Sequence, residues 1–251
     1  MSQGINLRPA ARLPLVLNWG DPHEPLPLQP LRGDMPSLGI ESLIPPWLPT
    51  GPEWQPFDFC SHVRRLCDDI TRRCAELAHV RTGQVLFGIT RSRNGRSNGL
   101  QARLTPMRFA GGRLTRRHRE IEYQVQRFVV AEQEILYLMT FCVPRFLNQP
   151  FEDKLVTIFH ELYHIGPQFD GDMRRHEGRC SVHTHSQRVY DEHMAQLARA
   201  YLSGGPDPDL HAFLRLSHRQ LLDRHGSVIG VRIPRPKLIP LIDESAPCPA
   251  S

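Results

Sequence analysis

The sequence predicts an α+β domain in which a small, mostly antiparallel sheet packs against a central helix and the C-terminal half is helical. Three patterns lead to this fold class. Apolar residues at three- and four-residue steps predict an amphipathic helix over Phe57 to Leu77. Runs of β-branched and aromatic residues predict strands between Gln84 and Val143. A second helical stripe predicts the central helix over Pro150 to Ile165.

The elements before the central helix carry local signals of their own. Asp58 is placed to cap the first helix. The β-prone runs Gln84 to Arg91 and Leu100 to Ala110 flank a loop with two Asn-Gly pairs, which predicts a hairpin with a long basic tip. Tyr123 to Val130 and Ile135 to Val143 follow as two further strands.

The central helix has matched start and stop signals. Pro150 suits its first turn, and Glu152 and Asp153 favour the positive end of the helix dipole. The pair Gly166-Pro167 ends it. Its apolar stripe consists of Leu155, Ile158, Phe159, Leu162 and Ile165. This stripe leaves the histidines of the helix on an adjacent face.

Two more helices are predicted after the central one. Ser186 is placed to cap a helix that continues to Leu202, before the breaker Gly204-Gly205-Pro206. A last helix covers about Asp209 to Arg224, and a short strand-like run, Ser227 to Ile233, follows it.

Proline density divides the chain into three parts. Residues 1–56 are rich in proline and have no lasting period, so we expect an irregular or disordered arm. Trp19, Trp47 and Trp54 lie in this arm and predict that part of it docks. Residues 57–225 form the folded domain, and residues 226–251 are a C-terminal extension.

Composition limits the class of protein. The chain has 251 residues, of which 40% are hydrophobic, enough for a substantial core. No run approaches about 18 consecutive apolar residues, so we expect no membrane contact, no secretory signal and a cytoplasmic location. The six cysteines include no C-x-x-C pair. Cys60, Cys67 and Cys74 recur every seven residues, a spacing that suits core thiols in a reducing compartment.

Basic residues are concentrated in one segment. The formal net charge is +5, and the stretch from Thr82 to Arg119 contains no acidic residue. Its nine arginines are Arg91, Arg93, Arg96, Arg103, Arg108, Arg113, Arg116, Arg117 and Arg119. This local positive field predicts a DNA contact through Arg91–Arg119. The alternative is a solvated face in a chain that uses arginine for nearly all its basic residues.

The central helix carries the motif H-E-x-x-H. His160 and His164 are four residues apart, so both imidazoles lie on one face about 6 Å apart and can bind one ion. Glu161 is displaced by about 100° around the helix and can take a proton without ligating the metal. A Zn²⁺ ion lowers the pKa of a bound water and polarises a carbonyl group. Chance would produce the triplet roughly 0.03 times in such a chain.

A catalytic zinc ion needs a third protein ligand. The metzincin continuation is absent, because Pro167 and Asp170 occupy the positions of its glycine and histidine. A gluzincin would use a following helix, where Glu192 can serve. The full set of downstream candidates is Asp170, Asp172, His176, Glu177, His183, His185, Glu192 and His193.

The block from Glu152 to Tyr201, with the basic segment before it, resembles the phage-associated metallopeptidase domain. That group comprises small bacterial and phage zincins similar in outline to the SprT-like proteins. The resemblance covers about Phe57 to Leu202. The residues that carry the resemblance are H-E-L-Y-H-I-G-P from His160, then Phe169-Asp170-Gly171-Asp172, Arg174-Arg175, Gly178-Arg179 and Val182-His183-Thr184-His185.

The resemblance implies a zincin-like fold and metal-dependent peptidase activity. It makes His160 and His164 the paired ligands, Glu161 the general base and His183 the third ligand. His185 is equally well spaced for that last role. The Cys-rich zinc ribbon that often follows a SprT domain has no counterpart in this sequence.

We therefore expect Zn²⁺-dependent hydrolysis of peptide bonds in a peptide or protein substrate. Two other functions would leave different traces. A non-catalytic, zinc-organised nucleic-acid-binding module built on Arg91–Arg119 would bind DNA without Glu161-dependent cleavage. A toxin or phage-derived structural remnant with a degenerate site would hold no zinc. The intact H-E-x-x-H motif favours the enzyme over both.

Overall fold

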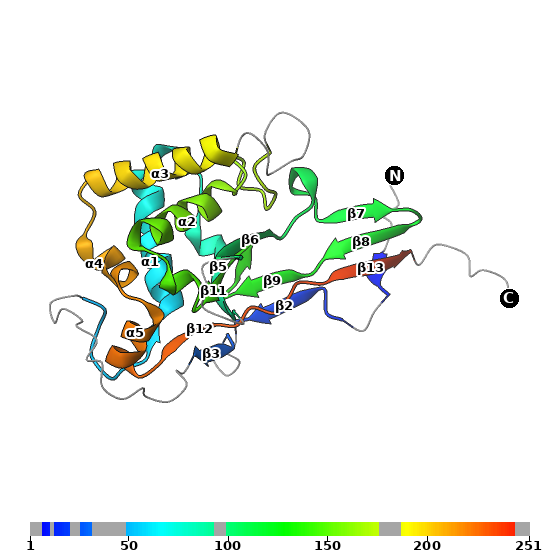
Figure 1. The fold of residues 1–251 in the computed structure, drawn as a ribbon. Coiled ribbons are helices and arrows are strands. Elements are labelled where there is room, and N and C mark those ends of the chain that lie inside the picture. Colours follow the sequence, from blue (N-terminus) through cyan, green and yellow to red (C-terminus); the bar gives the residue numbers. More distant parts are fainter. Residues whose placement is uncertain are drawn as a thin grey trace.

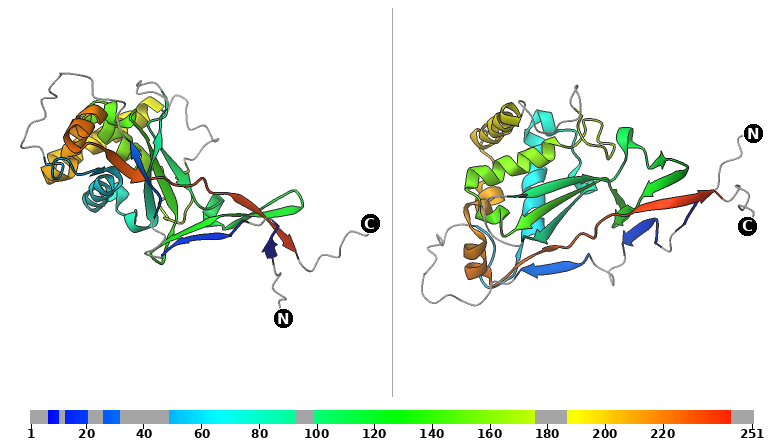
Figure 2. Two further views of the ribbon diagram at one scale, coloured as in Figure 1. Left: turned by 90° about the horizontal axis from the view of Figure 1, so that it is seen from below. Right: turned by 45° about the vertical axis from the view of Figure 1, so that its right-hand side comes forward.

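The computed structural model of the protein describes residues 7–10, 13–20, 26–31, 49–92, 99–175 and 187–243. It is a mixed α+β structure, as the sequence predicts. The helices gather on one side, and strands extend away from them as a long ribbon (Figure 1). Two further views show the same separation (Figure 2). Among the described residues, no helix combines the length and the apolar character needed to cross a membrane.

The central sheet has three strands in the order β5-β11-β6. β11 (Tyr137–Val143) runs parallel to β5 (Val85–Arg91) and antiparallel to β6 (Ala102–Pro106). The two predicted strands β5 and β6 exist, but the predicted hairpin between them is wrong because β11 lies between them. Nearly every residue of β11 is buried, and a strand that is apolar on both faces takes the central position of a sheet. The sheet is therefore mixed.

Two helices cover one face of this sheet. α1 (Phe59–Arg73) begins at Asp58, whose Oδ1 accepts a hydrogen bond from the Ser61 amide at 3.0 Å, so the predicted cap is confirmed. α1 ends before the predicted Leu77, because Cys74 is extended and short 3₁₀ turns at Ala75–Leu77 and Thr82–Gln84 follow. α2 (Phe151–Tyr163) is the predicted central helix. The main hydrophobic core lies between these helices and the sheet.

A second, smaller core lies on the opposite face. Leu86 and Leu138 of the central sheet pack there against Phe128 and Ile135. Trp19 meets Phe128 edge to face at 5.1 Å. The strands that build this face are β2 (Val16–Trp19), β9 (Arg127–Val130) and β10 (Gln133–Ile135). These strands thus cover part of the second face of the central sheet.

The two ends of the described chain take part in further sheets. The ribbon has the order β1-β13-β8-β7, and a small sheet has the order β3-β12-β4. Their strands are β1 (Leu7–Pro9), β13 (Leu238–Asp243), β8 (Ile121–Val125), β7 (Thr115–His118), β3 (Leu28–Leu31), β12 (Val228–Val231) and β4 (Phe57–Asp58).

These pairings differ from the irregular arm expected over residues 1–56. Three strands of that stretch, β1, β2 and β3, are hydrogen-bonded to strands far away in sequence. The expected C-terminal extension contributes β12 and β13, so its described residues, 226–243, are part of the same fold. Pro9 and Pro30 lie in edge strands, where a missing N–H is tolerated, and a proline-rich segment can therefore still pair.

The C-terminal half contains the remaining helices. α3 (Gln187–Ser203) packs against α2. α4 (Pro208–His211), the 3₁₀ turn Ala212–Arg215 and α5 (His218–His225) follow. The single helix predicted over Asp209 to Arg224 is wrong, because Leu216 is extended and Ser217 starts a new helix through a capping box with Gln220.

Candidate metal centre

The C-terminal turn of α2 holds the two histidines of the H-E-x-x-H motif together. Leu155, Ile158 and Leu162 of α2 are buried in the main core, which fixes the rotation of the helix. His160 and His164 are left half-buried on the neighbouring face. Their ring centroids are 4.6 Å apart and their planes are nearly perpendicular, at 81°. The predicted pairing of the two imidazoles is thus present.

Glu161 lies on the same turn but points into the protein. Glu161 is only 7% exposed. Burial raises the pKa of Glu161 to about 7, although a hydrogen bond from the Leu104 backbone and the charge of Arg103 favour the ionised form. Leu104 and Arg103 belong to β6, the edge strand of the central sheet. A carboxyl group with a pKa near neutrality is suited to accept and release a proton.

α3 brings two side chains to the histidine pair that sequence reasoning missed. The Tyr190 ring lies 4.8 Å from the His160 ring and 5.9 Å from the His164 ring. Asp191 Oδ1 lies 3.9 Å from His160 Nδ1. Tyr190 belongs to the apolar stripe of α3, but only the packing of α3 on α2 shows that this stripe ends at the motif.

The loop after α2 returns to the same place. The Arg174 amide donates to the His164 carbonyl at 2.8 Å, and Arg174 Nε donates to the Tyr163 carbonyl at 2.7 Å. The Arg174 guanidinium also lies over the Tyr163 ring, 3.9 Å from its centroid. Arg174 therefore lies beside the end of α2 that carries the histidines.

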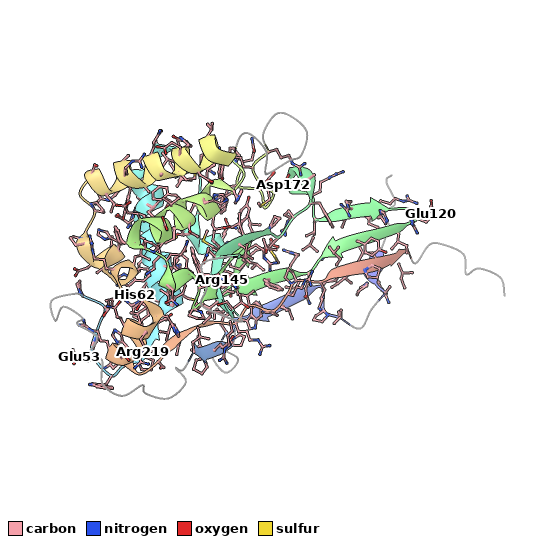
Figure 3. The ribbon with its side chains drawn as sticks, viewed as in Figure 1. Glu53, His62, Glu120, Arg145, Asp172 and Arg219 are labelled. Carbon is pink, nitrogen blue, oxygen red and sulfur yellow. The ribbon has the colours of Figure 1, made fainter. Side chains whose placement is uncertain are left out.

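Asp172 orders this loop. Its carboxylate accepts hydrogen bonds from the amides of Gly111 and Met173 and pairs with Arg175 at 3.1 Å. Tyr137 Oη of β11 donates to the Asp172 carbonyl at 2.9 Å. Figure 3 shows Asp172 where the loop meets the connection between β6 and β7. These contacts assign Asp172 a structural role.

Among the described residues, no candidate third ligand forms a metal-holding group with the two histidines. His183 and the alternatives His176, Glu177 and His185 lie outside the described residues. Glu192 is exposed on α3, with Oε1 2.7 Å from Arg199 Nη2, and His193 Nε2 lies 2.9 Å from Glu76 Oε2. Within the described ranges, no group of three or more His, Cys, Asp or Glu side chains is arranged to hold a metal ion.

The arginines of the Arg91–Arg119 segment do not form one basic loop. Arg93 and Arg96 lie outside the described residues. Arg108 is 10% exposed and pairs with Glu134 at 2.6 Å, and Arg117 pairs with Glu120 at the tip of the ribbon. Figure 3 shows Glu120 at that tip. The segment is spread over β5, β6 and β7, so its charges face different surroundings.

Comparisons with known protein families, with curated proteins and with solved structures give no match. Two imidazoles at helical spacing supply nitrogen donors of the kind that Zn²⁺ takes, and a buried carboxyl group stands on the same helical turn.

Proposed function

We propose that the protein is a zinc-dependent metallopeptidase in which His160 and His164 hold the ion and Glu161 is the general base. One observation carries the proposal: a buried carboxyl group with a pKa near 7 stands on the same helical turn as two imidazoles 4.6 Å apart. Burying a carboxyl group costs stability, so a buried glutamate beside two histidines is not expected on an ordinary amphipathic surface helix.

Glu161 performs the proton transfers of the reaction. When bound, the zinc ion supplies the Lewis acid that polarises the peptide carbonyl. The Glu161 carboxylate takes a proton from the attacking water as its oxygen bonds to the carbonyl carbon. The same proton passes to the leaving nitrogen as the C–N bond breaks. A pKa of about 7 suits both transfers, because the group can gain and lose a proton near neutral pH.

The edge strand β6 is suited to hold a peptide substrate. β6 has β11 on one side and no strand of the described chain on the other. The Leu104 backbone is hydrogen-bonded to the Glu161 carboxylate, so this open edge lies next to the proposed base. An extended peptide that pairs with an open edge gains main-chain hydrogen bonds without requiring a particular side chain. We therefore propose that the substrate is an extended peptide or protein segment.

We propose His183 as the third zinc ligand. The described residues on the two sides of its segment both contact the end of α2: Arg174 through Tyr163 and His164, and Tyr190 through the two histidine rings.

The described cysteines Cys60, Cys67, Cys74 and Cys142 are free, which supports our proposal of a reducing, cytoplasmic location.

Metal analysis of the purified full-length protein tests the proposal. We expect one zinc ion per chain, lost in H160A and in H164A and strongly weakened in H183A. H118A is the matched control, because His118 is an exposed histidine on β7. Casein and the protein itself are the first substrates to try. Wild-type protein without stoichiometric metal, or full zinc binding by H160A, would refute the metal centre.

A further inference from the structure

A cavity of about 590 Å³ lies on the face of the central sheet opposite α2. Thr90, Thr105 and Thr140 form part of its floor, one from each strand of the sheet. The chain segment 232–238 leads from β12 into β13 and runs along this side of the sheet (Figure 2), and its residues line the cavity. The volume is typical of sites that bind a small organic ligand. The cavity is separate from the His160–His164 pair.

The lining of this cavity is basic and contains no acidic residue. Its five cationic residues are Arg103, Arg108, Arg232, Arg235 and Lys237. Arg108 is paired with Glu134, which also pairs with Arg127. None of the other four forms an ion pair with a carboxylate in the described part of the chain. Arg103 also acts on the buried Glu161, so Arg232, Arg235 and Lys237 supply most of the positive potential that attracts anions to this cavity.

These charges are carried by backbone that is held in place. Ile233 packs so closely on Gly88 of β5 that a Cβ atom on Gly88 would lie 2.5 Å from it. The Arg232 amide donates to the Pro27 carbonyl at 2.8 Å, and the Gln126 amide donates to the Lys237 carbonyl at 2.8 Å. Arg103 shares the floor with Thr140, because the two are partners in the β11–β6 register. A site arranged in advance loses less free energy on binding.

The other lining groups indicate the kind of anion. The three threonine hydroxyls are hydrogen-bond donors that suit phosphate oxygens. Phe109, Ile233 and Pro234 add apolar surface, on which a flat ring can pack. Phosphate groups and a base occur together in a nucleotide.

We propose that this cavity binds a nucleotide unit through its phosphate groups, supplied either by a free nucleotide or by a single strand of nucleic acid. The site does not depend on the proposed peptidase activity. It also differs from the DNA contact expected over Arg91–Arg119, because only Arg103 among its unpaired cations comes from that segment, whereas Arg232, Arg235 and Lys237 come from the C-terminal extension.

Binding of two probes to the full chain tests the proposal. One probe is a fluorescein-labelled oligothymidine of about ten nucleotides, and the other is a fluorescent ATP analogue. Both are titrated at about 50 and 200 mM salt. Tighter binding of the oligothymidine identifies a nucleic-acid strand as the ligand, and tighter binding of the ATP analogue identifies a free nucleotide. Either result supports a phosphate site.

Charge-matched variants show whether the cavity is responsible. The triple variant R232Q/R235Q/K237Q should lose at least ten-fold in affinity, and its salt slope with oligothymidine should fall by about 2, since each phosphate contact in a single strand contributes about 0.7. The control R64Q/R65Q/R72Q removes the same charge from α1, on the opposite face of the sheet, and should lose less than two-fold.

A milder variant, R235Q, should lose about three-fold at an exposed position where folding is not at risk. Three results would overturn the proposal. These are no binding of either probe at the lower salt concentration, equal losses in the two triple variants, and displacement of both probes by polyglutamate as effectively as by pyrophosphate.

Discussion

The two faces of the central sheet use polar groups in opposite ways. On the α1 and α2 face, three buried polar side chains have specific partners: the Leu104 backbone donates to Glu161, Lys154 donates to two carbonyls, and Asp69 accepts from Tyr201. On the opposite face, basic side chains surround an open cavity. Burial alters the pKa values of single groups on the first face, whereas several charges act together on the second. The first arrangement suits proton transfer and the second suits attraction of an anion.

The largest effect is expected from Glu161. E161Q keeps the shape and a hydrogen-bonding group but removes the base, so peptidase activity should fall by about 10² to 10⁴ while zinc content and thermal stability are retained. Activity and metal content are measured on the same preparation. E152Q is the matched control, because Glu152 is exposed in the first turn of α2. Loss of zinc in E161Q would make Glu161 a ligand and contradict the proposed mechanism.

Asp191 should act through His160. Its carboxylate lies 3.9 Å from His160 Nδ1, so we expect it to attract that side of the ring and to leave the other ring nitrogen for the proposed metal. D191N should weaken zinc affinity by about ten-fold or more, measured by competition with a chelating dye. E192Q, at the next position, is the control and should bind zinc like the wild type. If E192Q is the weaker binder, Glu192 is a ligand and the role of Asp191 is refuted.

Lys154 tests what burial costs on the helical face. It is 2% exposed, and Nζ donates to the carbonyls of Leu214 at 3.0 Å and Leu216 at 2.7 Å. K154M leaves both carbonyls without this donor and should lower the free energy of unfolding by about 2 to 3 kcal/mol. Urea denaturation at pH 7 measures the loss. A variant as stable as the wild type would show that the carbonyls find other partners.

Lys154 should also make stability depend on pH. Burial lowers its pKa from 10.5 to about 8 in the folded protein. Between these values the unfolded chain holds a proton that the folded chain has lost, so the free energy of unfolding should rise with pH from about 8 to 10.5. K154M should lose this rise. K237M, which changes the exposed second lysine of the chain, should keep it. An unchanged rise in K154M would assign the effect to other groups.

The smallest effect on stability is expected on the opposite face, at Gly88. An added Cβ would lie 2.5 Å from Ile233 and 2.9 Å from the Val231 carbonyl, so G88A should lower the free energy of unfolding by about 1 to 2 kcal/mol. Because the shift moves segment 232–238, it should also weaken the two probes of the cavity. G83A is the control, since its Cβ meets nothing within 4 Å. Equal stability of the two variants would mean that segment 232–238 moves away from the added Cβ atom at little cost in free energy.

Features with local causes were predictable from the sequence. The Asp58 cap, the limits of α2 and the pairing of His160 with His164 depend on residues within one or two helical turns of one another. Helical geometry alone sets such spacings. The α+β class follows for the same reason, because the periods of helices and strands differ.

Features that join distant parts of the chain were decided by the tertiary structure. Proline density predicted an irregular N-terminal arm, yet its strands pair with partners from β9, β12 and β13. The hairpin prediction failed because β11, the most buried strand, gains more by lying between β5 and β6 than at an edge.

The sequence by itself determined which residues can do chemistry: the H-E-x-x-H triad and an excess of arginine, both properties of residue type and local spacing. The tertiary structure decided what surrounds them. It buried Glu161 against β6, brought Asp191 to His160 from α3, and gathered Arg232, Arg235 and Lys237 beside Arg103. The reason is that desolvation and electrostatic fields depend on distance in space, and packing of the two cores sets those distances.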